Sequence, residues 1–171
     1  MQTAAGRPAT VAEGAAGEAV DEAHRRTRLA EVSPESSAGI TDLLLAVKAG
    51  VAEHFERELS GLQKPQFLVY GVGDFFHSHA DTSDEPTEAA YVRDRVVSAL
   101  IFVNGETDDQ ERAGYGGGAL AFFGLMDDGG DAVGLPLTGQ AGLLVAFPAE
   151  LVHGVLPVTR GERCTIATWF T

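Results

Sequence analysis

The sequence predicts a mainly β protein that forms a barrel or a two-sheet jelly roll, with helical structure ahead of it. From Gln66 onward the chain is a series of short runs of β-branched, aromatic and aliphatic residues, separated by Gly, Asp and Pro. Many short strands with turn signals between them are typical of such folds. One earlier segment has helical periodicity, and the length of 171 residues suits a single domain with a sizeable core.

The N-terminal part, residues 1–37, reads as a flexible or partly helical extension. Residues 1–17 are rich in Ala, Gly and Thr without apolar periodicity, so we expect them to be disordered. In residues 18–32 the frequent Ala, Arg and Glu favour a helix with a thin apolar stripe. The run from Ser33 to Ser37, which contains Pro34, is expected to interrupt it.

A single domain is predicted for residues 38–171, and it begins with a helix over residues 41–60. Thr41 is the expected N-cap of this helix and Gly61 its stop. Apolar residues recur there at spacings of three and four, which marks one buried face. The members of this face are Leu44, Val47, Val51, Phe55 and Leu59.

The barrel core is predicted over residues 66–171. Its expected strands are 66–71, 75–81, 96–104, 118–124, 142–148, 151–158 and 162–171. The polar segment 82–95 interrupts this rhythm, and a connection of that length in a small domain is more often functional than idle. We therefore expect it to act as a lid.

Composition excludes several classes of function. The net charge of −13 argues against nucleic acid as a partner, because phosphate binding needs clustered Lys and Arg. Cys164 is the only cysteine, which excludes an internal disulfide and a thiolate metal cluster. No apolar run has transmembrane length and no secretory signal is recognisable, so we expect a cytoplasmic protein without a membrane partner.

The most informative stretch runs from Tyr70 to Asp81. His79 and Asp81 are two residues apart in an extended segment, and the period of a strand is two, so both should project from one face. An imidazole and a carboxylate on one face can hold two adjacent positions of a metal ion. A third ligand from another strand would complete the two-histidine, one-carboxylate set of non-haem Fe(II) oxygenases.

The third ligand is expected to be His153, which interrupts an otherwise apolar strand. Taken alone, such a histidine is more often a hydrogen-bonded core residue than a ligand, but the His79 and Asp81 pair reverses those odds. By alternation His77 shares the face of His79, and we interpret it as a neighbour of the ligands or a residue of the pocket wall. His24 and His54 lie on predicted helices among charged residues, where they read as solvated surface groups.

Arg163 is the second informative residue. An arginine in an apolar strand needs a carboxylate to compensate its burial. That carboxylate could belong to a dicarboxylic acid held on the metal, or to an acidic side chain at the barrel rim. Arg163 alone does not decide between the two.

Together these residues resemble the 2-oxoglutarate- and Fe(II)-dependent dioxygenase superfamily, in its prolyl 4-hydroxylase-like branch, over residues 66–171. The first matching motif is Tyr70, Gly73, Phe75, His79 and Asp81. The next two are Phe102-Val103-Asn104 and Gly117-Gly118-Ala119-Leu120. The last comprises Phe147-Pro148, His153, Val155-Leu156-Pro157-Val158, Gly161, Arg163 and Trp169-Phe170.

The resemblance implies a double-stranded β-helix, also described as a jelly roll or cupin-like barrel, flanked by one or two helices. It implies that His79, Asp81 and His153 bind Fe(II) and are catalytic. It also implies that Arg163, Tyr70 and Thr165 bind 2-oxoglutarate, with ascorbate as a candidate reductant. The candidate substrate contacts are His77, Asn104, Trp169 and Tyr91. Phe102 lacks the hydroxyl of the tyrosine that is usual at its position.

The function implied is hydroxylation with dioxygen, with release of succinate and CO2. The expected substrate is a small molecule derived from an amino acid, or a peptidyl residue of the prolyl type. Two alternatives stay open at this point. One is a cupin-like metal enzyme that does not use 2-oxoglutarate, which would have no need of Arg163. The other is a catalytically silent, metal-bound interaction module. The oligomeric state cannot be read from the sequence.

Overall fold

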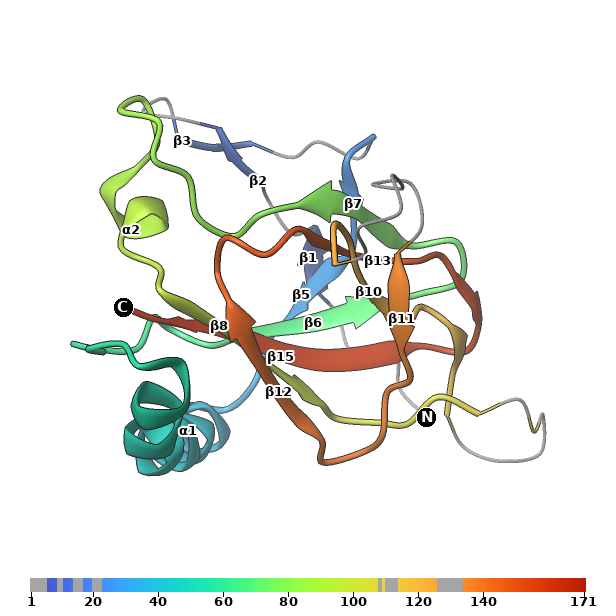
Figure 1. Cartoon of the computed structure of the whole chain (residues 1–171). Coiled ribbons are helices and arrows are strands. Elements are labelled where there is room, and N and C mark those ends of the chain that lie inside the picture. Colours follow the sequence, from blue (N-terminus) through green and yellow to red (C-terminus); the bar gives the residue numbers. More distant parts are fainter. Residues whose placement is uncertain are drawn as a thin grey trace.

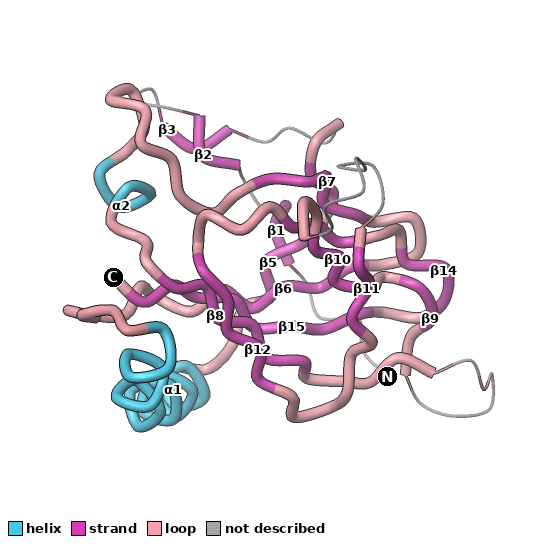
Figure 2. Tube along the Cα trace, viewed as in Figure 1, coloured by secondary structure: helices cyan, strands magenta, loops and turns pink. Residues whose placement is uncertain are grey.

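The computed structural model describes residues 23–107, 109, 114–125 and 134–171, together with the backbone of 6–8, 11–13 and 17–19. Two antiparallel sheets face each other, and the helix α1, Pro34–Phe55, lies against the outside of one of them (Figure 1). The short helix α2, Ala90–Arg93, lies at one end of the sheets (Figure 2). None of the helices among the described residues is long and apolar enough to cross a membrane.

The larger sheet has six strands and the smaller one has five. The order in the larger sheet is β1 (Gly6–Pro8), β5 (Arg28–Ala30), β6 (Gln66–Tyr70), β15 (Arg163–Phe170), β8 (Val97–Phe102) and β12 (Leu144–Pro148). The order in the smaller sheet is β11 (Leu135–Leu137), β10 (Leu120–Phe122), β13 (His153–Val155), β7 (Phe75–His79) and β4 (Arg25–Arg26). Two further pairs are β14 (Val158–Arg160) with β9 (Gly116–Gly117), and β2 (Val11–Glu13) with β3 (Gly17–Ala19). This arrangement confirms the predicted jelly roll.

The larger sheet is apolar on both faces, because it has a neighbour on each side. Its inner face contributes Leu100 and Phe102 to a cluster with Phe122 of the smaller sheet. Its outer face packs Val97 and Phe170 against Leu44 of α1. Alternate residues of one strand therefore serve two cores, as the period of a strand requires. The cavity described below opens between the two sheets.

The helix predicted over residues 41–60 is displaced toward the N-terminus in the structure. Ser33 is the N-cap, its Oγ accepts a hydrogen bond from the Ser36 amide at 3.2 Å, and Pro34 occupies the first turn. The prediction that these residues interrupt a helix is wrong, because proline at the first helical position loses no intrahelical hydrogen bond. Thr41 lies inside α1, and the helix ends at Phe55, where Glu56 is left-handed with φ 53°.

The helix predicted over residues 18–32 is also wrong, because β4 and β5 occupy its second half. Arg28 and Leu29 pair with β6, and the Thr27 hydroxyl donates to the Val69 carbonyl at 2.9 Å. Edge pairing has overridden a weak helical propensity here. Of the predicted disorder in residues 1–17, the described parts belong to β1, β2 and β3, and the remainder lies outside the described residues.

The predicted strand 118–124 is shortened to β10, because left-handed glycines precede it. Gly117 and Gly118 have φ of +66° and +65°, which ends β9 and lets β10 start in a new direction. The predicted strand 151–158 is divided into β13 and the start of β14. The strands predicted at 66–71, 75–81, 96–104, 142–148 and 162–171 all exist with slightly shorter bounds.

Gly154 of β13 offers a test of how closely β13 and β7 approach each other. A Cβ at this position would lie 2.8 Å from the Phe76 carbonyl oxygen and 3.2 Å from backbone atoms of His77 and Ser78. We predict that Gly154→Ala lowers the free energy of unfolding by about 1–3 kcal/mol, as overpacking does. Urea denaturation measures this. The matched control is Gly50→Ala on the exposed side of α1, where nothing lies within 4 Å. It should stabilise by about 0.5–1 kcal/mol. Equal effects of the two alanines would contradict the close approach.

Candidate active site

The pairing of β7 with β13 brings two histidines face to face. His79 and His153 are partners in the antiparallel register of these strands. Their ring centroids are 4.4 Å apart. The next pair is Val155 with Phe76, so the register shifts within the ladder, as at a β-bulge. Because of that shift, Phe76 and His79 both face the cavity although they are three residues apart.

Each of these histidines is oriented by a carbonyl two residues earlier in the chain. The Nδ1 atom of His79 lies 2.8 Å from the His77 carbonyl oxygen, and Nδ1 of His153 lies 2.8 Å from that of Leu151. A carbonyl can only accept, so both Nδ1 atoms carry the proton. In a neutral ring the lone pair is then on Nε2, the atom that points toward Asp81. Such a hydrogen bond fixes the tautomer and orientation of metal-binding histidines.

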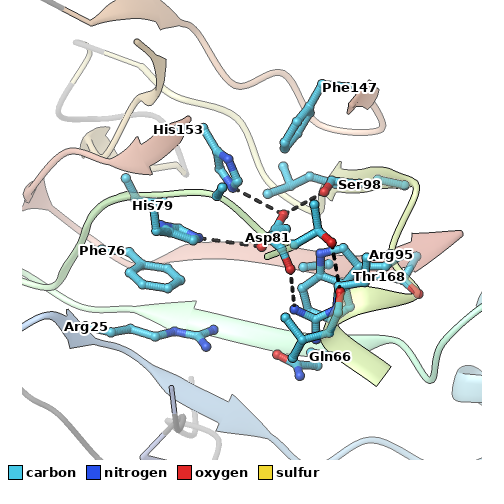
Figure 3. A pocket seen from close by; sticks show the side chains of 18 of the residues that line it. Arg25, Gln66, Phe76, His79, Asp81, Arg95, Ser98, Phe147, His153 and Thr168 are labelled. Carbon is cyan, nitrogen blue, oxygen red and sulfur yellow. Dashed lines mark hydrogen bonds and ion pairs between the residues drawn. The ribbon is translucent and has the colours of Figure 1, made fainter. Parts of the chain in front are cut away.

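Asp81 follows the end of β7 and completes the cluster (Figure 3). Its Oδ1 lies 3.6 Å from Nε2 of His79 and its Oδ2 lies 3.3 Å from Nε2 of His153. The Ser98 hydroxyl donates to Oδ2 at 2.6 Å, and the Asp81 amide donates to the Ala149 carbonyl at 2.8 Å. The carboxylate is therefore held from the smaller sheet, from β8 and through its own backbone.

The electrostatics of the cluster favour an ionised Asp81 and a neutral His153. Burial by itself would raise the pKa of Asp81, but the neighbouring His79 and His153 and the Ser98 hydroxyl lower it far below its ordinary value. Burial lowers the pKa of His153, and His79 adds to this effect while Asp81 opposes it. A carboxylate and neutral imidazoles are the forms that bind metal ions.

The three ligand atoms lie within 4.8 Å of one another. One carboxylate and two imidazoles are the donor set of the facial triad, which suits non-haem Fe(II) and leaves coordination positions free. The residues present therefore fit a catalytic iron ion better than a closed structural site. The predicted trio of His79, Asp81 and His153 is the only such group among the described residues.

A cavity of about 340 Å³ adjoins the cluster and runs between the sheets. Its wall includes Tyr70 and Leu68 on β6, and Trp169 on β15. Segment 82–95 and α2 contribute the rim, including Tyr91. Three predicted site residues, Tyr70, Tyr91 and Trp169, thus line the cavity beside the metal ligands. Arg163 and Thr165 are buried and do not form part of its wall.

Arg95 connects segment 82–95 to Asp81 and to Trp169 of β15. Its guanidinium donates to the Asp81 carbonyl at 3.0 Å and to Oε1 of Gln63 at 3.1 Å. The guanidinium carbon lies 3.6 Å from the centre of the Trp169 ring. This cation–π contact and the two hydrogen bonds fix the end of segment 82–95 against β15.

Arg163 is fully buried, with 0% of its surface exposed. It is paired in register with Tyr70, and the rings of Tyr70 and Phe102 flank its guanidinium, each centroid 5.1 Å from the guanidinium carbon. One NH group donates to Oγ1 of Thr165 at 3.2 Å. The other terminal nitrogen and Nε have no hydrogen-bond partner among the described residues. Among the described residues no carboxylate pairs with this side chain, so the alternative of a rim ion pair finds no support there.

Burying a guanidinium whose N–H groups lack acceptors costs free energy of folding. A carboxylate is the acceptor that matches these N–H groups best. The surroundings leave room around the arginine stem only because Gly118 lacks a side chain, since a Cβ there would lie 3.1 Å from Cδ of Arg163. Burial lowers the pKa of Arg163, which Tyr70 and Tyr115 oppose. A guanidinium nevertheless keeps its charge in proteins. The donors fit the distal carboxylate of 2-oxoglutarate.

Two predicted substrate residues lie elsewhere. His77 is exposed and outside the cavity wall, because the bulge between β7 and β13 breaks the alternation on which its prediction rested. Its carbonyl, not its ring, reaches the site. Asn104 also lies outside the wall, and its side chain bridges β8 to β15 by accepting from the Cys164 amide at 2.9 Å and donating to the Glu162 carbonyl at 2.8 Å.

Sequence reasoning missed several residues of the site. His24 was expected on a surface helix but lines the cavity, as does Arg25, whose guanidinium lies 4.6 Å from the Phe76 ring centre. The Phe76 ring in turn stacks on His79 at 3.6 Å (Figure 3). Ser98 could have been found, because it is the polar residue of an otherwise apolar β8. His54 is exposed at the end of α1, as predicted.

A jelly roll with two histidines and one carboxylate on its inner face defines a class of mononuclear metal proteins. Within that class, the sequence model of the 2OG-Fe(II) oxygenase superfamily matches residues 65–171. This is more than half of the chain, and the protein belongs to that superfamily. The cofactors of the family are Fe(II) and 2-oxoglutarate, in agreement with the donor set.

Curated relatives support this membership. The chain is 37% identical over 106 residues to a PKHD-type hydroxylase of Beijerinckia indica, and covers 42% of its length. It is 33% identical over 151 residues to a PKHD-type hydroxylase of Burkholderia thailandensis, and covers 60% of its length. These matches span 61% and 86% of the present chain. The chain thus corresponds to less than two thirds of either relative.

A solved structure of a Pseudomonas putida prolyl-4-hydroxylase superposes on the chain with a TM-score of 0.67 and 26% sequence identity. The match covers 89% of the present chain and 74% of the other. The fold is therefore similar to that of this prolyl-4-hydroxylase.

We predict that His79→Ala, Asp81→Ala and His153→Ala each reduce metal affinity by at least an order of magnitude, because each removes one of three ligands. Calorimetric titration with Mn(II), an air-stable substitute for Fe(II), measures this. His77→Ala is the matched control, since it keeps the carbonyl that orients His79. It should bind Mn(II) as the unmodified protein does. Undiminished affinity in His153→Ala would contradict the assignment.

Proposed function

We propose that this chain is a non-haem Fe(II)- and 2-oxoglutarate-dependent dioxygenase. It hydroxylates an amino-acid-derived or peptidyl substrate of the prolyl type, with release of succinate and CO2. The whole described chain forms one catalytic domain, which begins before residue 38 because β4 and β5 belong to its two sheets.

The observation that carries this proposal is the combination of a facial triad with a buried, unsatisfied arginine. A metal enzyme without 2-oxoglutarate would have no need of Arg163, whose unpartnered nitrogens cost free energy in the absence of a carboxylate. A silent interaction module would have no need of free coordination positions. The two features together favour the dioxygenase over both alternatives.

Each residue then has a role. His79, Asp81 and His153 hold the iron, and Ser98 holds the Asp81 carboxylate in position. The distal carboxylate of the cosubstrate is bound by Arg163, with Tyr70 and Thr165 beside the arginine. Iron and 2-oxoglutarate, when bound, supply the oxidative chemistry that inserts oxygen from O2 into a C–H bond, while the protein supplies position and a closed cavity.

The substrate proposal rests on the printed names of the relatives and on the cavity wall. Relatives are named PKHD-type hydroxylases, and the similar solved structure is a prolyl-4-hydroxylase. Tyr91 and Trp169 line the cavity that adjoins the metal ligands, and we propose that they contact the substrate there. Segment 82–95 forms that rim, and its closure over a bound substrate stays a prediction.

We predict that Arg163→Met raises the 2-oxoglutarate Michaelis constant at least thirtyfold, since removing one partner of a buried charge pair costs about 2–5 kcal/mol. Succinate release in the presence of Fe(II), with a proline-containing peptide panel as substrate, gives the constant. Methionine keeps most of the apolar volume, and Mn(II) affinity should be unchanged because Arg163 is not a ligand.

The control for this change is Arg160→Met. Arg160 is a partly buried arginine of β14 whose guanidinium donates to the Thr107 carbonyl, away from the cavity wall. Its loss should leave the Michaelis constant for 2-oxoglutarate unaltered. A normal constant in Arg163→Met would favour the metal enzyme that does not use 2-oxoglutarate.

A further inference from the structure

Tyr115 is a fully buried tyrosine that the roles above do not include. It lies directly before β9, and 0% of its surface is exposed. Its hydroxyl forms no well-aligned hydrogen bond among the described residues, and the side chain that interacts with it is Arg163. A buried hydroxyl without a partner costs about 1–3 kcal/mol relative to an equivalent apolar group. Phenylalanine would fill nearly the same volume without this cost in free energy. We therefore expect the hydroxyl to have a role other than packing.

The Tyr115 side chain lies beside the buried guanidinium. A Cβ placed on Gly118 would lie 3.1 Å from Cδ of Arg163 and 3.6 Å from Cε2 of Tyr115. A Cβ placed on Gly139 would lie 2.1 Å from the Tyr115 hydroxyl and 2.5 Å from the Phe102 ring, which itself flanks the guanidinium. The hydroxyl and the guanidinium therefore share one closed space, which Phe102 borders without contributing a polar atom.

The closed space contains more hydrogen-bond donors than the described residues provide acceptors for. Nε and one terminal nitrogen of Arg163 lack partners, and so does the Tyr115 hydroxyl. Burial raises the pKa of the Tyr115 phenol, although Arg163 opposes the shift, so the hydroxyl stays protonated and can donate. A carboxylate accepts at about four lone-pair positions, and a guanidinium fork takes only two of them in parallel.

We propose that Tyr115 is a cosubstrate-binding residue, whose hydroxyl donates to the distal carboxylate of 2-oxoglutarate alongside the fork of Arg163. The proposal rests on the proposed function, because it requires that Arg163 binds this carboxylate. It adds a donor from the residue before β9 to the donors that β15 supplies beside the guanidinium. A dicarboxylic 2-oxo acid is thereby selected over a 2-oxo acid with an apolar tail.

The test is Tyr115→Phe, with binding of 2-oxoglutarate to the Mn(II)-loaded protein measured by calorimetry and thermal unfolding measured without cosubstrate. Loss of a hydrogen bond to a charged group should weaken 2-oxoglutarate binding about tenfold to a hundredfold. The melting temperature of the cosubstrate-free variant should be equal or higher, because an unsatisfied hydroxyl has been removed. A purely structural hydroxyl would lower the melting temperature instead.

Three controls separate the possible causes. Thr41→Val removes a hydroxyl from α1, on the outer side of the larger sheet, and should leave 2-oxoglutarate affinity unchanged. 2-Oxovalerate has the same metal-chelating end without the distal carboxylate, so Tyr115→Phe should leave its binding unaltered. The double variant Phe102→Tyr with Tyr115→Phe offers a hydroxyl to the same space from β8, and should recover part of the lost affinity.

Unchanged 2-oxoglutarate affinity in Tyr115→Phe would overturn the inference while leaving the proposed function intact, provided that Arg163→Met still loses binding. Equal weakening of 2-oxovalerate and 2-oxoglutarate would also overturn it, because the effect would then not involve the distal carboxylate. Failure of the unmodified Mn(II)-loaded protein to bind 2-oxoglutarate would instead contradict the proposed function itself.

Discussion

The site depends on one constraint, the antiparallel pairing of β7 with β13. This pairing places His79 opposite His153, and the register shift beside it turns Phe76 to the same side as a support for the His79 ring. The chain then brings Asp81 between the two imidazoles as it leaves the strand. The larger sheet contributes Arg163, which lies buried and lacks hydrogen-bond partners for two of its nitrogens among the described residues. Under the proposed function, each sheet supplies one half of a two-point site for 2-oxoglutarate.

Much of this was predictable from the sequence. Turn residues between short apolar runs identified the jelly roll, because local hydrophobic alternation and turn chemistry are sufficient for that level of description. The ligand pair was predictable because His79 and Asp81 are close in sequence. His153 and Arg163 stood out as polar residues in apolar strands, because burying a polar group costs free energy unless a partner compensates it. The family motifs then joined these observations into one site.

The remainder depended on tertiary contacts that leave no local signal. The alternation rule placed His77 in the pocket, but a bulge is set by two strands together and cannot be read from one. The segment with Arg25 has helical composition, yet it pairs as an edge strand and brings that arginine to the cavity. The unpaired state of Tyr115 is likewise a property of its surroundings. The start of α1 at Pro34 was readable in principle, since serine followed by proline is a common helix start.

The most direct test of the central claim is an anaerobic optical titration of this chain. Fe(II) is added first, and 2-oxoglutarate is then added in steps. If His79, Asp81 and His153 hold iron with free positions beside Arg163, a visible charge-transfer absorption of the Fe(II)–2-oxo acid chelate should develop and saturate at one equivalent of cosubstrate. The absorption should be absent in Asp81→Ala. Failure of the unmodified protein to develop the absorption, with Fe(II) shown to be bound, would contradict the account.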